Sequence, residues 1–465
     1  MQKNKMFSTY KLSILPILFS MNLHAQQFID PQLKKPINAA IENNYEIQNK
    51  QLEVQKNDYQ LLETKGILSP QLKAIGGAAY MQAYGVLDVP SKHINIIDVD
   101  LFEKEKKFKT SNALAHVGLM GSQVIFSGLQ VTNGLKALEE KRLALDDLVY
   151  ASKEEIANEI LKSYDQLMLL KQVDSLIDNS QKRLDKERQK VQQAIQNGLA
   201  IPYDREKIKL ALLELESKKV ELKGSKILLY DKLKMLTHLP LEELQAIEYP
   251  LQEINILHQT YDLSKKRELS ALQHSKKAYE FLVEKEKGSK LPQVFAFAGL
   301  NYTTLFAGKT VLKDVSTTGD VTLKMNELSL FPNFMIGIAA KWDIFDGNQN
   351  KNKLQQARIE LNLQENKYKE AEEKLNLLLK KNRVDYETAQ EKLKVSDQQQ
   401  SIAKQNLAIA SKRFQQGLID VTERLAAEND YYKANMAYYT QLVEQRSYSY
   451  DLLQTTGQLL EKILE

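Results

Sequence analysis

The chain has no cysteine, and no apolar run of about 20 residues follows its first 25 positions. The first absence excludes disulfides, thiolate metal sites and the acylated cysteine of an N-terminal lipoprotein. The second excludes membrane-spanning helices after the N-terminal segment, so any membrane crossing by this chain must be made of strands.

Glycine and proline are missing from two long stretches. Residues 135–197 and 348–416 contain neither, and each stretch stops at a glycine, Gly198 or Gly417. The second stretch carries an apolar heptad that includes Leu354, Leu361 and Tyr368. We therefore predict two helices of roughly 100 Å each, which is longer than a single globular core. After each glycine a shorter helix restarts, so each unit is a helical hairpin.

The balance of charges is close to neutral. Lys and Arg exceed Asp and Glu by 4, and without Lys3, Lys5 and Lys11 of the N-terminal segment the difference is 1. This value does not indicate a nucleic-acid partner, since the charges alternate along helix surfaces. The histidines are scattered, and we find no nucleophile motif and no phosphate-binding loop. We predict that the protein is not an enzyme and needs no metal or other cofactor.

The N-terminal segment, residues 1–25, is typical of a signal peptide. Lysines come first, an apolar run from Leu12 to Leu23 follows, and Ala25 precedes the predicted cleavage point. Export without cysteine suits a bacterial envelope protein, and we predict that it is not an N-terminal lipoprotein.

The chain contains an internal duplication. Phe126 and Phe345, which stand before the two long helices, are 219 positions apart, and Gly198 and Gly417 have the same offset. We predict a first repeat at residues 36–237, a connector at 238–262, a second repeat at 263–457 and a short tail at 458–465. Each repeat is expected to contain a helix, a strand, a loop, a strand, a long helix, a turn and a shorter helix.

Four strands are predicted by alternating or short-period apolar patterns, at about 71–86, 114–126, 293–306 and 334–345. The segments between the paired strands, Asp88 to Ser111 and Ala307 to Pro332, are polar, and we expect them to be loops. One face of the fourth strand is apolar from Phe334 to Ile344, and Trp342 is suited to a membrane interface. Four strands cannot close a barrel. The sheet is therefore either water-soluble or shared between several chains.

These features resemble the TolC family of bacterial outer-membrane efflux factors. The likeness rests on the segment Trp342-Asp343-Ile344-Phe345-Asp346-Gly347 before a long helix and on the turn from Arg413 to Thr422. The resemblance implies a mainly α protein with long coiled-coil hairpins. It further implies four transmembrane strands per chain, contributed to a shared twelve-stranded β-barrel of a homotrimer in outer-membrane lipid. The implied location is the outer membrane of a Gram-negative bacterium, with the helices extending into the periplasm. A periplasmic adaptor protein and an inner-membrane pump are the implied partners.

The resemblance also assigns roles to residues at the two turns. Gly198, Leu199, Gly417 and Leu418 match the periplasmic tips that contact the adaptor, and Asp204 and Glu423 match acidic positions at the channel entrance. Two positions depart from the family pattern, since Phe414 and Ile419 stand where a tyrosine and a basic residue are expected. The candidate substitutes in gating are Tyr203, Arg205, Arg413 and Asp420. Helix capping and surface ion pairing are equally compatible with these four residues.

The predicted function is an outer-membrane channel of a tripartite efflux or type I secretion system. A periplasmic adaptor also has a signal peptide and a helical hairpin, but it needs only one hairpin. A surface coiled-coil protein without a pore is the other alternative. The duplicated strand and helix unit favours the channel.

Overall fold

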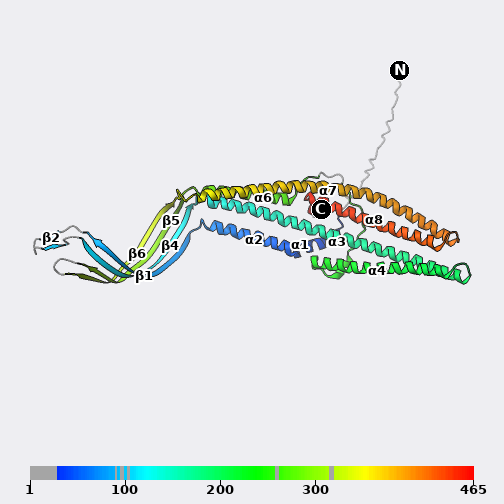
Figure 1. The fold of residues 1–465 in the computed structure, drawn as a ribbon, viewed down its shortest axis with the longest axis horizontal. Helices are drawn as coiled ribbons and strands as arrows, with labels where there is room; N and C mark the ends of the chain where they lie inside the picture. Colours follow the sequence, from blue (N-terminus) through cyan, green and yellow to red (C-terminus); the bar gives the residue numbers. More distant parts are fainter. Residues whose placement is uncertain are drawn as a thin grey trace, which may run out of the picture.

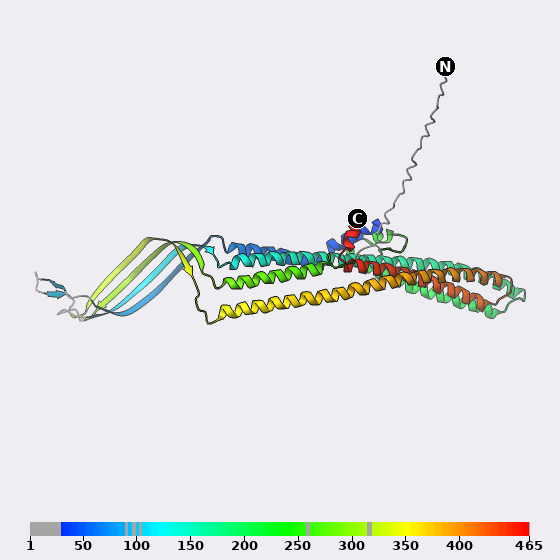
Figure 2. The same ribbon diagram turned by 90° about the horizontal axis from the view of Figure 1, so that it is seen from above.

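The computed structural model describes residues 29–88, 92–94, 99–101, 105–256, 261–313 and 319–464. The molecule is elongated, with a twisted β-sheet at one end and long helices running from it to the other end (Figure 1). The predicted signal peptide, residues 1–25, lies outside the described residues. Figure 2 shows that the sheet and the helices follow one long axis.

Two pairs of helices form the hairpins. The first consists of α3 (Gln130–Gln196) and α4 (Pro202–Thr237), and the second of α7 (Gln349–Gln415) and α8 (Val421–Thr455). The two long helices have 67 residues each, or about 100 Å. The remaining helices are η1 (Pro31–Leu33), α1 (Lys34–Asn43), α2 (Tyr45–Gly66), α5 (Leu241–Ala246), α6 (Arg267–Gly288) and α9 (Leu459–Leu464).

The helix predicted from Pro36 to Lys65 is interrupted at Asn44. The backbone of this residue is extended, and its side chain accepts hydrogen bonds from the amides of Glu46 and Ile47. Asparagine is a favourable N-cap because its oxygen satisfies amides that lack a helical partner. The sequence pattern continues through this position, so periodicity alone misses the break.

The described strands form an antiparallel four-stranded sheet in the order β1-β4-β5-β6 and a small β2-β3 hairpin. Their bounds are β1 Gln71–Leu87, β2 Lys92–Ile94, β3 Val99–Leu101, β4 Lys106–Phe126, β5 Gln293–Leu312 and β6 Val321–Lys341. The strands are longer than predicted, and the loop expected from Ala307 to Pro332 is largely wrong. Backbone pairing continues into the polar segments because strand residues that face water need not be apolar.

The fourth strand also ends earlier than predicted. Lys341 pairs with Gln293, the first residue of β5, and beyond this pair β6 has no partner on that strand. Trp342 and Ile344 therefore lie after the strand rather than on its apolar face, which runs along β6 only as far as Ala340. The interfacial role predicted for Trp342 remains a prediction.

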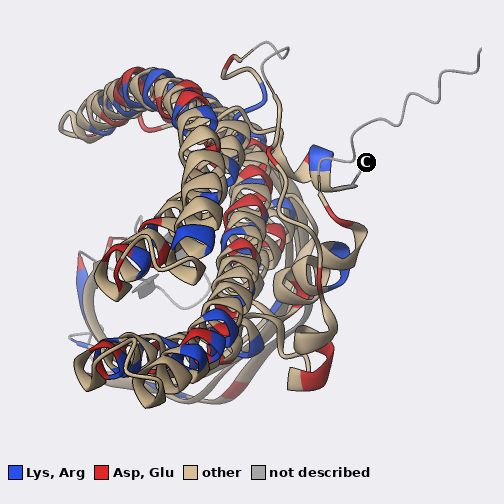
Figure 3. Cartoon of the chain, turned by 90° about the vertical axis from the view of Figure 1, so that its right-hand side faces the viewer, with Lys and Arg blue, Asp and Glu red and all other residues tan. Residues whose placement is uncertain are grey.

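Buried side chains form two clusters along the helices. The larger lies at mid-length, where α1, α3, α8, α9 and the connector between α4 and α6 meet, and it includes Ile37, Ile160, Leu161 and Leu453. The smaller lies towards the tips between the two hairpins and includes Ile177, Leu184 and Ile208. Seen from the tip end, the helices follow an arc that is open on one side, with charges of both signs interspersed on their surfaces (Figure 3).

Candidate functional site at the tips of the two helical hairpins

Both hairpins turn through the same backbone motif. After α3, the amide of Leu199 donates to the carbonyl of Ala194 at 2.8 Å, and that of Gly198 to Ile195 at 3.1 Å. After α7, Leu418 donates to Arg413 at 2.9 Å and Gly417 to Phe414 at 3.1 Å. This is the Schellman ending of a helix, which requires a left-handed residue one position beyond the cap. Gly198 and Gly417 supply it with φ of 69° and 70°.

The leucine that follows each glycine points into solvent. Leu199 is 81% exposed and Leu418 is 66% exposed, although leucine gains free energy from burial. The prediction that paired these residues with the two glycines therefore selects the most prominent apolar side chains of the tips. An apolar residue held out on a rigid turn can contact a partner at little conformational cost.

A capping box consists of two hydrogen bonds between the N-cap residue and the residue three positions later, and each of the two shorter helices has one of them. Asp204 in α4 accepts a hydrogen bond from the amide of Ile201 at 3.4 Å, while Ile201 itself has no side chain that can accept one. In α8 the N-cap Asp420 accepts from the amide of Glu423 at 2.8 Å. Asp204 and Asp420 are thus helix-capping residues in this structure.

A cleft of about 880 Å³ separates the two tips. Its lining brings together many of the residues selected from the sequence, which are Leu199, Asp204, Gly417, Leu418, Asp420 and Glu423. Phe414 and Ile419, the two departures from the family pattern, also line it. The cleft is lined by four carboxylates, those of Glu187, Asp204, Asp420 and Glu423, and by the ammonium of Lys190, so its net potential is negative.

The other three candidates lie outside this cleft. Lys207 stacks on the ring of Tyr203 at 4.4 Å and donates to Thr422 of α8 at 2.7 Å. The guanidinium of Arg205 pairs with its neighbour Glu206 and donates to Gln192 at 3.2 Å, so it stays within the first hairpin. Arg413 is exposed, and its carbonyl, not its side chain, takes part in the turn.

A buried network of charges, not predicted from the sequence, joins α8 to α3. Arg424 is 1% exposed and donates to Glu187 at 2.8 Å and to Glu428 at 2.9 Å. Arg183 donates to the other side of Glu428 at 2.6 Å. Burial would raise the pKa of Glu428, but the two guanidinium groups outweigh it and hold that pKa below its ordinary value.

Glu187 responds differently to the same surroundings. Burial raises the pKa of this carboxyl, and the attraction of Arg424 only partly opposes the effect. In this network the guanidinium groups outweigh the cost of burying the Glu428 carboxylate but not that of burying the Glu187 carboxylate. A signal for it exists in the sequence, since Arg183 with Glu187 and Arg424 with Glu428 are opposite charges spaced i,i+4.

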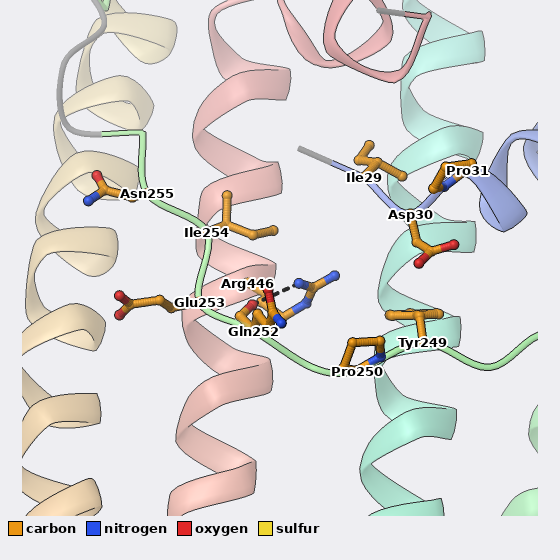
Figure 4. A pocket seen from close by; sticks show the side chains of 10 residues that line it. All are labelled: Ile29, Asp30, Pro31, Tyr249, Pro250, Gln252, Glu253, Ile254, Asn255 and Arg446. Atoms are coloured by element: carbon orange, nitrogen blue, oxygen red, sulfur yellow. Dashed lines mark hydrogen bonds between the residues drawn. The ribbon is translucent and has the colours of Figure 1, made fainter. Parts of the chain in front are cut away.

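A second buried network fixes the connector at mid-length. Asp165 of α3 accepts hydrogen bonds from Tyr249 at 2.7 Å, Arg446 at 2.7 Å and Tyr450 at 2.9 Å. Figure 4 shows Arg446 reaching to the connector, where it donates to the carbonyl of Gln252 at 2.8 Å. Burial and the Asp165 carboxylate raise the pKa of Tyr249 far above its ordinary value, so this phenol donates in its neutral form.

Over the described ranges, no group of three or more His, Cys, Asp or Glu residues is placed to hold a metal ion. Within those ranges, no helix combines the length and the apolar character that a membrane span requires.

Trp342 lies at the other end of the helices, next to the sheet. Its side chain is 59% exposed, and its indole nitrogen donates to the carbonyl of Lys290 at 3.0 Å. This bond fixes the ring at the junction of sheet and helices.

Comparison with known proteins shows the fold, and part of the chain matches a sequence-family model. Residues 262–458 match the family model described as outer membrane efflux protein. The outer membrane protein VceC of Vibrio cholerae is similar with a TM-score of 0.69 and 16% identity, covering 93% of this chain and 97% of that one. The comparison of the sequence with curated proteins gives no match.

Two further solved structures show the same likeness. The outer membrane channel CmeC of Campylobacter jejuni has a TM-score of 0.69 and 14% identity, covering 98% of this chain and 94% of that one. The open state of the MtrE outer membrane channel of Neisseria gonorrhoeae has a TM-score of 0.66 and 15% identity, covering 92% and 90%. The likeness therefore extends over both hairpins and the sheet.

Proposed function

We propose that the chain is an outer-membrane efflux channel of the outer membrane efflux protein family that extends into the periplasm, and that three copies of it form one duct. The observation that carries this proposal is the open sheet. β1 and β6 each pair with a single neighbour among the described strands, so both edges of the sheet are free. Four strands are too few to close around a filled interior, whereas twelve are enough.

The free edges must be covered in lipid. Unpaired backbone amides and carbonyls in hydrocarbon cost several kcal/mol each by general estimates of about 2–7 kcal/mol. Pairing β1 of one copy with β6 of the next satisfies both edges and gives the shared twelve-stranded barrel.

The helices offer matching edges. Towards the tips α7 packs on α8, α8 on α3 and α3 on α4, so α4 and α7 lie at the two ends of this row of helices. Both carry apolar side chains that are exposed in the single chain. The exposed apolar residues include Leu210, Leu213, Val220, Ile227 and Leu228 on α4, and Ile359, Val384, Val395, Ile402 and Ile409 on α7. Contact between α4 and α7 of adjacent copies would bury them and would close the helical tunnel.

We also propose that the two repeats arose by duplication, as residues 36–237 and 263–457 joined by the connector 238–262. The long helices have equal lengths, α2 and α6 have 22 residues each, and the two tip glycines keep the offset of 219. The 1–25 segment would direct export and be removed after Ala25.

The tips are the proposed contact with a periplasmic adaptor, through which an inner-membrane pump delivers substrate. Exposed Leu199 and Leu418 flank the acidic cleft and present an apolar surface with a charged rim, as expected for a docking surface. A periplasmic adaptor or a poreless surface protein does not need four long strands with an exposed apolar face.

The absence of cysteine makes the trimer testable by crosslinking. Ala74→Cys on β1 would be combined in turn with Phe334→Cys, Ile336→Cys and Ile338→Cys on β6, in the full-length protein in its membrane. At least one combination should give a crosslinked trimer on a non-reducing gel. The matched control joins direct partners of one sheet, Ala115→Cys and Thr304→Cys, and should give only monomer.

Reconstituted protein should also conduct ions in single-channel recordings. A chain that remains monomeric and soluble without detergent, or one in which no β1 to β6 pair crosslinks between copies, would contradict the proposed trimer.

A further inference from the structure

Four lysines gather at the end of the sheet that is farthest from the helices. Lys107 and Lys109 lie on β4, Lys309 on β5 and Lys324 on β6, and all four are exposed. Lys309 stands directly opposite Lys324 in the antiparallel register. On β4, Ser111 is the direct partner of Lys309. Lys109 precedes Ser111 by two residues and therefore lies on the same face of the sheet.

These lysines share a face with the apolar surface of the sheet. Lys109 is the direct partner of Tyr84 on β1, and its ammonium lies 5.3 Å from the centre of that ring. The β1–β4 register has no shift, so alternate residues from Tyr84 back to Leu72 point to the same side. Leu72 is 74% exposed, and across the sheet the same side carries Ile336, which is 72% exposed.

None of the four lysine ammonium groups forms an ion pair with a residue that the structure describes. Glu327, the acidic residue on this face of β6, is engaged with the hydroxyls of Thr304 and Ser329. Like charges directly opposite one another destabilise a sheet. The Lys309–Lys324 pair therefore indicates an anion supplied from outside the chain.

The depth of the lysines matches the surface of a bilayer. Leu72 and Tyr84 are 12 residues apart on β1, which corresponds to about 40 Å along the strand and about 30 Å along the normal at a tilt of about 40°. A hydrocarbon core is about 30 Å thick. The ring of Tyr84, beside Lys109, marks the level at which it ends. The lysines extend from that level into the headgroup region.

We infer that Lys107, Lys109, Lys309 and Lys324 form a headgroup site for a lipid that carries phosphate groups in the outer leaflet of the membrane. The inference rests on the proposed function, because the helices on the periplasmic side place this end of the sheet at the outer leaflet. A phosphate offers several strong acceptor oxygens, and each ammonium has three donors. Two phosphates on one headgroup would bridge the Lys309–Lys324 pair and the β4 lysines.

The test uses the full-length protein purified in detergent as the proposed trimer. Bis-phosphorylated lipid A is titrated, and bound lipid is counted by native mass spectrometry, with dephosphorylated lipid A and inorganic phosphate as comparison ligands. The variant replaces all four lysines with Gln. The control variant removes the same charge from exposed helix positions, as Lys209→Gln, Lys223→Gln, Lys351→Gln and Lys353→Gln.

We expect the sheet variant to bind the bis-phosphorylated lipid at least about 25-fold more weakly, since a lysine near an anionic surface contributes about fivefold in affinity. The helix variant should bind as the unchanged protein does, and replacement of the four lysines by Arg should retain binding. Equal affinity of the sheet variant and the unchanged protein would overturn the inference. So would binding of dephosphorylated lipid with the same affinity, or displacement of the lipid by millimolar inorganic phosphate.

Single-channel conductance separates the two proposals. A sheet variant that conducts normally is folded, so its lipid affinity tests the site alone. If the unchanged protein neither trimerises nor conducts, the proposed duct fails, whatever the lysines bind.

Discussion

The guanidinium Nε of Arg424, in the first turn of α8, donates a 2.8 Å hydrogen bond to Oε1 of Glu187 in α3. This bond crosses between the two hairpins, close to the tips that enclose the acidic cleft. Its counterpart in the first repeat, 219 positions earlier, is Arg205, which pairs with the adjacent Glu206 and leaves the second hairpin free. The two arginines at this duplicated position therefore have different roles: Arg424 links the two hairpins, whereas Arg205 forms a surface ion pair.

Replacing Arg424 with Leu should destabilise the packing of the two hairpins by about 3 kcal/mol, because Glu187 would remain largely buried without its partner and Glu428 would keep only Arg183. Hydrogen exchange of the first turns of α8 should become faster, and the midpoint of thermal unfolding should fall. Arg205→Leu is the matched control and should cost less than about 1 kcal/mol, since its pair is exposed. Equal effects of the two variants would show that the buried network does not hold the hairpins together.

The sequence predicts the hairpins well because its signals there are local. A glycine after a long stretch without glycine or proline ends a helix, and Gly198 and Gly417 do so through the same backbone motif. Strand ends are harder to predict. β6 continues through Thr322 and Lys324 because β5 lies beside it, and it stops at Lys341 because β5 begins opposite that residue. Pairing with a neighbour is not a property of either segment alone.

The candidate site shows the same division between local and tertiary signals. The caps at Asp204 and Asp420 follow from residue type and position at a helix start. Arg424 has the composition of a surface residue, yet it is 1% exposed. Its burial depends on where α3 lies, which one sequence cannot give. Opposite charges at i,i+4 are so frequent on exposed helices that they do not single out this network.

Gly417→Ala should destabilise the second tip by about 1 kcal/mol, because a side chain disfavours the left-handed backbone at φ of 70°. A Cβ at this position would meet no atom within 4 Å, so the cost comes from the backbone conformation alone. Gly417→Asn should cost less than the alanine variant. Exchange of the Leu418 amide reports the change.

Gly224→Ala serves as the control for the tip glycine. Gly224 lies inside α4 with open space around it, so alanine should stabilise that helix by about 0.5–1 kcal/mol. A destabilising effect at both positions would mean that added volume, not backbone conformation, determines the outcome.

Glu154→Gln should stabilise the protein at high pH. Burial raises the pKa of Glu154 to about 7, with Lys266 and backbone amides of α9 opposing the shift. Between the unfolded value of 4.5 and 7 the folded chain binds more protons than the unfolded chain, so stability falls as pH rises through this window. The Gln variant has no carboxyl at this position, so its stability does not fall for this reason as pH rises. It should be more stable by about 2 kcal/mol at pH 8 and equal to the unchanged protein near pH 4.

The measurement for Glu154 is the midpoint of thermal unfolding at pH 4, 6 and 8. The exposed neighbour Glu155, replaced by Gln, provides the control and should show no difference that grows with pH. A Glu154→Gln variant whose stability relative to the unchanged protein is the same at all three pH values would contradict this account of the buried carboxyl.

Trp342 is the single tryptophan of the chain, so its fluorescence reports one position. If it lies at the periplasmic interface of the membrane, lipids brominated near the headgroup should quench it more strongly than lipids brominated at the end of the acyl chain. The comparison variant moves the probe to β6 by combining Trp342→Phe with Ile338→Trp. Quenching should then shift towards deeper bromine positions. Identical depth profiles for the two probes would rule out the interfacial placement.

Glu423→Ala should weaken block of the reconstituted channel by multivalent cations added on the periplasmic side. Glu423 lines the cleft between the tips together with Asp204 and Asp420, and three copies of the chain would place nine such carboxylates around one entrance, in addition to Glu187, which is paired with Arg424. Close carboxylates concentrate multivalent cations, so removing three of the nine should raise the half-blocking concentration of such a cation by about three- to tenfold at low salt. Glu216→Ala, on an exposed part of α4 farther from the turn, should leave block unchanged.

Asp420→Asn is the suitable variant at the neighbouring acidic position. Because Asp420 also caps α8, asparagine keeps the cap and removes only the charge. Block that stays the same in both Glu423→Ala and Asp420→Asn would place the carboxylates of this cleft away from the path of the ions.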